Sequence, residues 1–115
     1  MTVLEVIPFP KPRMNHKSLW TKTAKRYFTK ADELREKANG LVLPPILTIT
    51  FIIPMAKSWP IKKKKEYDGK PHQQRPDLSN LVKAVEDILC EEDSYIFRYD
   101  KVEKIWGYEG KIIIF

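Results

Sequence analysis

The segment ILTITFIIP, residues 46–54, is the stretch that decides the fold class. All of it except two threonines and the closing proline is strongly apolar, and the β-branched Ile and Thr that dominate it favour strands. A short apolar run without regular polar alternation is typical of a strand that is buried on both faces, or nearly so. We therefore expect residues 46–54 to form a central strand of a sheet.

The sequence after this strand predicts two helices. Residues 54–76 have the composition of a connector, in which Ser58 caps a short helix that begins near Pro60 and ends before Gly69, with lysines on all its sides. The next segment, LSNLVKAVEDIL at 78–89, repeats apolar residues at helical spacing. Its expected packing face is Leu81, Ala84, Val85 and Ile88, and its polar face is Asn80, Lys83 and Asp87.

The two ends of the sequence predict further strands and one more helix. Residues 94–115 indicate two strands joined near 107–110, and TVLEVIP at 2–8 indicates a short strand. A proline-rich loop follows, and a helix is expected from about Lys30 to Ala38, with Thr29 as its N-cap. The predicted fold class is thus α+β, a small mixed sheet flanked by helices.

Size and composition indicate one domain. With 115 residues and 43% hydrophobic content, the chain supports a single modest core over residues 1–115. Its single cysteine, Cys90, cannot form an internal disulfide, which favours a reducing compartment. No apolar run approaches the roughly 20 residues of a membrane helix, and the N-terminus lacks a signal-peptide pattern, so we expect a soluble, cytoplasmic protein with no membrane partner.

The charge is unevenly distributed along the chain. The formal net charge is +6, made up of +5 over residues 1–53, +5 over 54–75 and −4 over 76–115. Residues 11–26 hold six basic side chains and no acid, with Trp20 and Tyr27 nearby, as in surfaces that follow a nucleic-acid backbone. A basic domain suggests a polyanionic partner, and a plain solubility role for the surface lysines stays open.

The acidic third of the chain needs its own explanation. Asp77 precedes the 78–89 helix, so its simplest role is an N-cap whose carboxylate accepts backbone hydrogen bonds. The alternative is a Mg²⁺ site, because Mg²⁺ is held by one or two carboxylates together with substrate phosphate. Asp87 and Asp93 are the other carboxylate candidates, and Lys83 is placed to neutralise a phosphate.

Several segments together resemble one known family. KPHQQRPDLSNLVKAVEDIL followed by EEDS, with PFPKPRMN and IPMAKSWPIKKKK upstream, is similar to the RusA family of Holliday junction resolvases, endonucleases common in phages and prophages. The hallmark of that family is a D-[LI]-D-N-L-x-K-A helix start followed by an acidic D-D-[SA] segment. The resemblance implies an α+β homodimer that binds a four-way DNA junction in the host cytoplasm and cuts it with Mg²⁺, for which Mn²⁺ is a possible substitute.

The resemblance also assigns roles to residues. Asp77 matches the first aspartate of the motif, Asn80 the asparagine, Lys83 the lysine and Asp93 the later aspartate, and Glu92 stands where another acid is frequent. The second motif aspartate is replaced by Ser79, a poorer ligand for Mg²⁺, so Asp87 or Glu92 is a candidate to compensate. The expected nucleic-acid contacts are Arg13, Lys17, Lys62, Lys63, Lys64, Lys65, His72 and Arg75.

Three functions follow as expectations. The first is a Mg²⁺-dependent endonuclease that resolves branched DNA in recombination or repair. The second is a weak or inactive nuclease that still binds branched DNA, which Ser79 favours. The third is a small interaction protein whose charge serves solubility alone. His72 is also compatible with an ordinary surface histidine in a polar loop.

Overall fold

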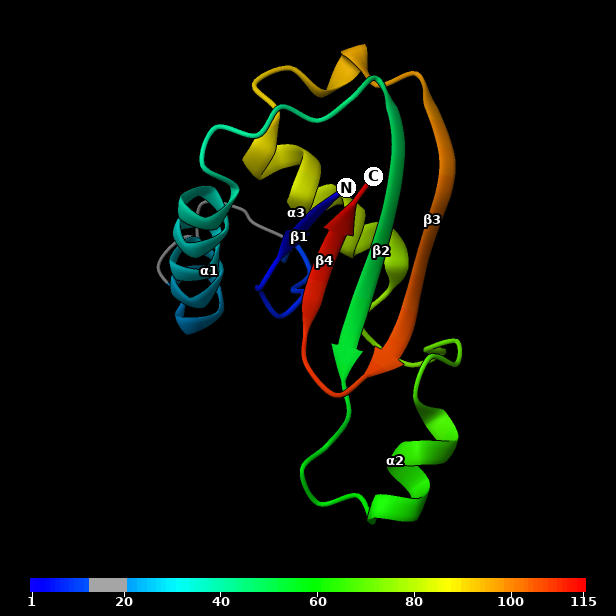
Figure 1. Ribbon diagram of the computed structural model, residues 1–115. Coiled ribbons are helices and arrows are strands. Elements are labelled where there is room, and N and C mark those ends of the chain that lie inside the picture. The colour runs from blue at the N-terminus through cyan, green and yellow to red at the C-terminus, as the bar shows by residue number, and fades with distance from the viewer. Residues whose placement is uncertain (13–20) are drawn as a thin grey trace.

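The protein is built around a mixed sheet with the strand order β1-β4-β2-β3 (Figure 1). The structure is a computed structural model that describes residues 1–12 and 21–115, and at Asp93 it describes only the backbone. The strands are β1 (Thr2–Leu4), β2 (Ile46–Pro54), β3 (Arg98–Gly107) and β4 (Lys111–Ile114). The helices are α1 (Lys22–Ala38), α2 (Ile61–Tyr67) and α3 (Leu78–Leu89), and a 3₁₀ turn spans Asp93–Tyr95. The α+β prediction is confirmed.

Strand β2 is an interior strand, as its sequence predicts. It pairs in parallel with β3 and antiparallel with β4. Its side chains Leu47, Ile49 and Phe51 are fully buried against the helices. The expectation of burial on both faces, or nearly so, is only partly correct, because on the opposite face Thr50 is 6% exposed whereas Thr48 and Ile52 are half-buried. Among the described residues no helix covers that face (Figure 1).

The two C-terminal strands are confirmed, although they do not pair with each other. Strand β2 lies between β3 and β4, so the turn that joins them passes the end of β2. Glycines permit this close passage: a Cβ on Gly107 would lie 2.3 Å from the Ile52 side chain, and one on Gly110 would lie 2.9 Å from the Ile7 backbone. Strand β1 is shorter than expected and ends at Leu4, which pairs with Ile112 near the start of its antiparallel partner β4.

Helix α1 begins at Lys22 and not at Lys30. Its N-cap is Thr21, whose hydroxyl accepts a hydrogen bond from the Ala24 amide at 3.2 Å. Thr29 lies inside the helix and donates its hydroxyl proton to the Lys25 carbonyl at 3.0 Å. The additional turns form because apolar side chains continue upstream at helical spacing and are buried; this buried row is Ala24, Tyr27, Ala31, Leu34 and Ala38.

Helix α3 has the predicted bounds and the predicted packing face. Leu81, Ala84 and Val85 are at most 2% exposed and Ile88 is 9% exposed, all within one core that also includes residues of α1, β2 and β4. Helices α1 and α3 contact each other, and α1 also contacts β1 of the sheet.

Helix α2 stands at the end of the sheet, away from the other helices (Figure 1). Its N-cap is Pro60 with no side-chain cap bond, so the prediction that Ser58 caps it is wrong. It is attached through Trp59 and Tyr67, whose rings contact Trp106 of β3. In the part of the chain described, no helix has the length and apolar character that crossing a membrane requires.

Candidate active site

Asp77 occupies the N-cap position of α3, but its carboxylate makes no capping hydrogen bond. The expected position is therefore confirmed and the expected capping bond is wrong. The side chain is exposed, and the backbone carbonyl of Asp77 accepts the first helical bonds, from the amides of Asn80 and Leu81. The carboxylate is consequently available to a ligand rather than to the helix end.

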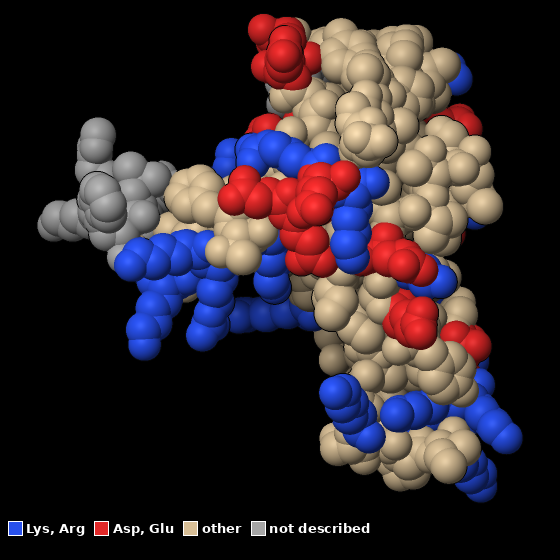
Figure 2. Space-filling model, turned by 60° about the vertical axis from the view of Figure 1, so that its left-hand side comes forward, with Lys and Arg blue, Asp and Glu red and all other residues tan. Residues whose placement is uncertain are grey.

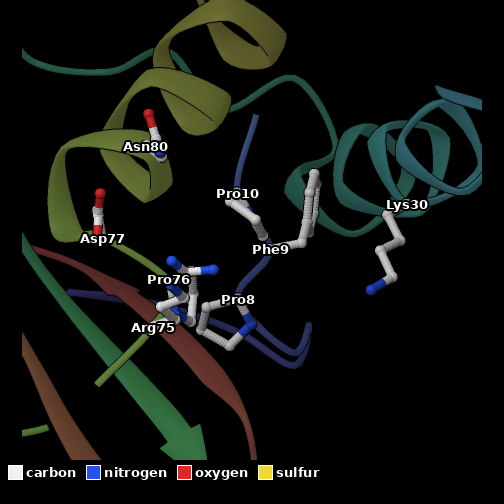
Figure 3. Close-up of a pocket in the computed structure, with 8 residues that line it drawn as sticks. All are labelled: Pro8, Phe9, Pro10, Lys30, Arg75, Pro76, Asp77 and Asn80. Carbon is white, nitrogen blue, oxygen red and sulfur yellow. The ribbon is translucent and has the colours of Figure 1, made fainter. Parts of the chain in front are cut away.

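The Asp77 carboxylate and the Asn80 amide line a cavity of about 670 Å³. Figure 3 shows the two residues on the first turn of α3, with the segment Pro8–Pro10 beside that turn and Lys30 of α1 on the far side of the segment. Arg75 and Pro76 complete the lining. A carboxylate and two cations thus lie around one opening, which is suitable for a phosphate. Lys30 is a site residue that the sequence does not reveal, because α1 lies far from the motif in the chain.

A second cavity, of about 470 Å³, lies on the other flank of the first turn of α3. Ser79 and Lys83 line it, and Asn80 lines both cavities. Its wall includes Glu86, which is 8% exposed and whose carboxylate accepts a hydrogen bond from the Tyr99 hydroxyl. The motif residues are therefore divided between two flanks of one helix turn, with Asn80 at the junction.

The loop that precedes Asp77 is held by Lys104 of β3. The Lys104 ammonium donates to the Pro76 carbonyl at 2.6 Å and also to the Gln74 carbonyl. These bonds position the backbone on both sides of Arg75 and directly before Asp77. The sequence gives no signal for this role, because the acceptors are backbone carbonyls.

His72 is buried, so the expectation of a surface histidine is wrong. Its side chain is 4% exposed, its ring centroid is 4.3 Å from that of Trp106, and its amide donates to the Lys104 carbonyl at 3.1 Å. The ring atom Nδ1 has no hydrogen-bond partner. Burial, and secondarily the charge of Lys104, lowers the pKa of His72 below its ordinary value. This residue supports the loop and presents little surface to nucleic acid.

The other carboxylate candidates have partners or lie outside the described side chains. The Asp87 carboxylate forms an ion pair with the Lys11 ammonium, and the Lys11 amide donates to the Asn80 carbonyl at 3.1 Å. The Glu92 carboxylate accepts a hydrogen bond of 2.9 Å from the Ser94 hydroxyl. Asp93 begins the 3₁₀ turn, and its side chain, like Arg13 and Lys17, lies outside the described part of the structure.

The described side chains offer part of a metal site. Among them no group of three or more His, Cys, Asp or Glu residues is arranged to hold an ion. Asp77 and Asn80 nevertheless provide a carboxylate and an amide at one cavity. This donor set fits Mg²⁺, which typically takes few protein ligands and completes its shell with water and substrate phosphate.

The lysine run lies on α2, away from this cavity. The Lys63 ammonium lies over the Trp59 ring at 3.9 Å from its centroid, so it packs on the protein. Lys63 and Lys64 are half-buried, whereas Lys62 and Lys65 are exposed. The expected all-round display of lysines is therefore only partly correct.

Comparison with known proteins gives one family. A family model described as endodeoxyribonuclease RusA matches residues 4–115. Comparisons with curated proteins and with solved structures give no significant match. The matched range extends from β1 to the end of β4 and includes both cavities of α3. The chain therefore belongs to the RusA endodeoxyribonuclease family.

Proposed function

We propose that this protein is a metal-dependent endonuclease that resolves four-way DNA junctions or related branched DNA in a bacterial cytoplasm. The observation that carries the proposal is the Asp77 carboxylate, which is not used as a helix cap and lines a cavity beside Arg75 and Lys30. The family, whose described activity is DNA cleavage, supports the same reading.

The residues at the cavity would have different roles in phosphodiester hydrolysis. Asp77 and Asn80 would hold the metal ion, with Asp93 and Glu92 as the further acids that the family motif suggests. Mg²⁺ or Mn²⁺, when bound, stabilises charge on the phosphodiester and lowers the pKa of the attacking water. Arg75 and Lys30 bind the phosphate, because guanidinium and ammonium groups complement its charge. Lys83, on the other flank, neutralises charge on the neighbouring backbone.

The working unit that we propose is a homodimer. A four-way junction has two symmetric strands to cut, and a two-fold axis in the protein supplies two equivalent sites. The uncovered face of the sheet is the surface that we assign to the second copy. On it, Val3 is exposed and Ile52, Ile105 and Ile113 are half-buried.

The direct test is cleavage of a synthetic four-way junction and a duplex of matched sequence, each with Mg²⁺, Mn²⁺ or EDTA. We expect symmetric cuts in the junction, little cleavage of the duplex, and none in EDTA. Tight junction binding without cleavage in either metal would instead support the second candidate, an inactive branched-DNA-binding protein, which the hydroxyl of Ser79 in place of a carboxylate favours. Equal binding of junction and duplex would contradict both.

A further inference from the structure

The cations of α1 differ between its two halves. In the second half, Arg35 pairs with Asp32 at 3.1 Å and Lys37 with Glu33 at 3.5 Å. In the first half, Lys22, Lys25, Arg26 and Lys30 are exposed, and no ion pair is found for them among the described residues. Cations without acidic partners are the ones available to a polyanion.

A groove connects this half of α1 with Asp77. Besides the Asp77 cavity, a smaller hollow of about 160 Å³ lies against α1, lined by Thr23, Arg26 and Tyr27. The two hollows share Phe9, Pro10 and Lys30, so they adjoin one another, and we describe the pair as a single groove. We call it the α1 groove: it begins at Asp77 and Arg75, passes Lys30 and ends at Arg26.

The base of the α1 groove is built from fixed parts. The Phe9 ring is 4% exposed and meets the Tyr27 ring edge-on, with centroids 5.7 Å apart. Pro8 and Pro10 restrict the backbone on either side, and the ion pair of Lys11 with Asp87 ties the same segment to α3. A DNA strand that binds in the groove therefore contacts a surface that is already ordered before binding.

The cations along the groove lie in one row. Arg26 and Lys30 line the groove, and Lys22 continues the row beyond its end, because steps of four residues stay on one side of a helix. The row is about 12 Å long at 1.5 Å per residue. Phosphates recur about every 3.4 Å of axis along one DNA strand, so the row spans several of them. Lys25 is a neighbour of Lys22, but it lies about 100° around the helix from Arg26 and further still from Lys30, and it lines neither hollow.

This row is separate from the lysines of α2. Figure 2 shows Lys and Arg side chains gathered over α1 and again over α2 at the lower end of the molecule. Only the α1 group adjoins the Asp77 cavity, because Lys30 lines that cavity and no residue of α2 does.

We infer that the α1 groove holds the backbone of the DNA strand that is cut, with Lys30 and Arg26 contacting successive phosphates on one side of the cleaved bond. The inference rests on the proposed function for the identity of Asp77 as the cleavage centre. It adds a direction, since the strand leaves Asp77 across α1 and not toward α2.

The test compares Lys30→Gln and Arg26→Gln with the matched control Lys25→Gln, which removes the same charge from the same helix. Binding to a synthetic four-way junction is measured in EDTA over a range of salt. Each groove variant is expected to reduce the slope of log affinity against log salt by about 0.9, and the control by nothing measurable. Phosphate-ethylation interference should show sites beside the cut position that disappear in Lys30→Gln and persist in Lys25→Gln.

Equal slope changes in all three variants, or no change in any of them, would contradict the inference that the groove binds DNA. These results are independent of catalysis. If the wild type fails to cleave with any metal while the three slopes differ as stated, the proposed function fails and the groove stands as a DNA-binding surface alone. If the wild type cleaves and the slopes do not differ, the proposed function stands and the inference about the groove fails.

Discussion

Asp77 is the residue on which DNA cleavage should depend most. Asp77→Asn keeps the N-cap position and the shape of the side chain but removes the charge that would hold a metal ion. We expect a loss of junction cleavage larger than the roughly 10–100-fold cost of losing an outer-shell partner. Junction binding should be unchanged or tighter, because a negative charge near the phosphates is removed. Cleavage and binding assays on the same preparation measure both.

The control for this variant is Asp68→Asn, an exposed carboxylate at the end of α2. It changes the net charge equally and lies outside the cavity, so its cleavage rate should equal that of the wild type. An Asp77→Asn enzyme that cleaves at the wild-type rate would remove this residue from the mechanism.

Ser79 is the position where the chain departs from its family motif. A carboxylate there, in Ser79→Asp, is expected to lower the Mg²⁺ concentration that gives half-maximal cleavage, because it adds an oxygen ligand of full charge near Asn80. Parallel Mg²⁺ titrations of the two proteins measure the shift. Coincident curves would mean that residue 79 serves only the cavity on the β3 side of the helix.

His72 should make stability depend on pH. Its pKa is lowered in the folded protein, so below a pH of about 6.5 the unfolded chain binds a proton that the folded chain does not. Stability is then lost as the pH falls from there toward the lowered pKa. In His72→Phe this contribution is absent, so urea unfolding at pH 8 and pH 5.5 should show a smaller loss than in the wild type. Equal losses of stability in the two proteins would contradict the assignment of this pH dependence to His72.

The sequence revealed the residues of the site that lie close together in the chain. Asp77 follows from its place before the helix, Asn80 follows from the polar face of the helix together with the family motif, and the structure brings the two to one cavity. Lys30 and Lys104 were not predicted, because each reaches the site from an element distant in sequence. His72 was misassigned since its neighbours in sequence are polar, whereas its neighbour in space is Trp106.

At the scale of elements, the start of α1 offers a direct comparison of two threonines. Thr21→Ala removes the hydroxyl that accepts the Ala24 amide and should lower the free energy of unfolding by about 1 kcal/mol. Thr29→Ala removes a hydroxyl that bonds back to a helical carbonyl, and it should be neutral or slightly stabilising. Denaturant unfolding of both variants measures the difference. The opposite order would restore the later helix start that the sequence suggests.

Elements were predictable where packing and local pattern agree. The β2 strand and α3 both bury one continuous apolar set, and both have the expected bounds. Residues 22–29 were obscured because Lys, Arg and Thr make up most of them, while the buried residues there are only Ala24 and Tyr27. The pairing of β3 with β2 and not with β4 depends on tertiary contacts that no local pattern reports.

At the scale of the whole molecule, the uncovered face of the sheet should determine the association state. Ile113→Lys places a charge among Val3 and Ile52 on that face and is expected to convert a dimer into monomers, with loss of symmetric junction cleavage. Val42→Lys is the matched control, because Val42 is 75% exposed and lies in the loop before β2. Sedimentation velocity gives the masses. A wild type that is already monomeric would contradict the proposed face.

The position of β4 has a consequence for synthesis of the protein. This strand follows every other strand in sequence, yet it lies inside the sheet, between β1 and β2. A nascent chain that has not yet reached residue 111 leaves β1 without a partner and one edge of β2 open. We therefore expect the core beneath Asp77 to close only after β4 has left the ribosome. An unfinished chain would then lack the DNA-cutting activity of the family, so incomplete translation products would not endanger the DNA of the cell.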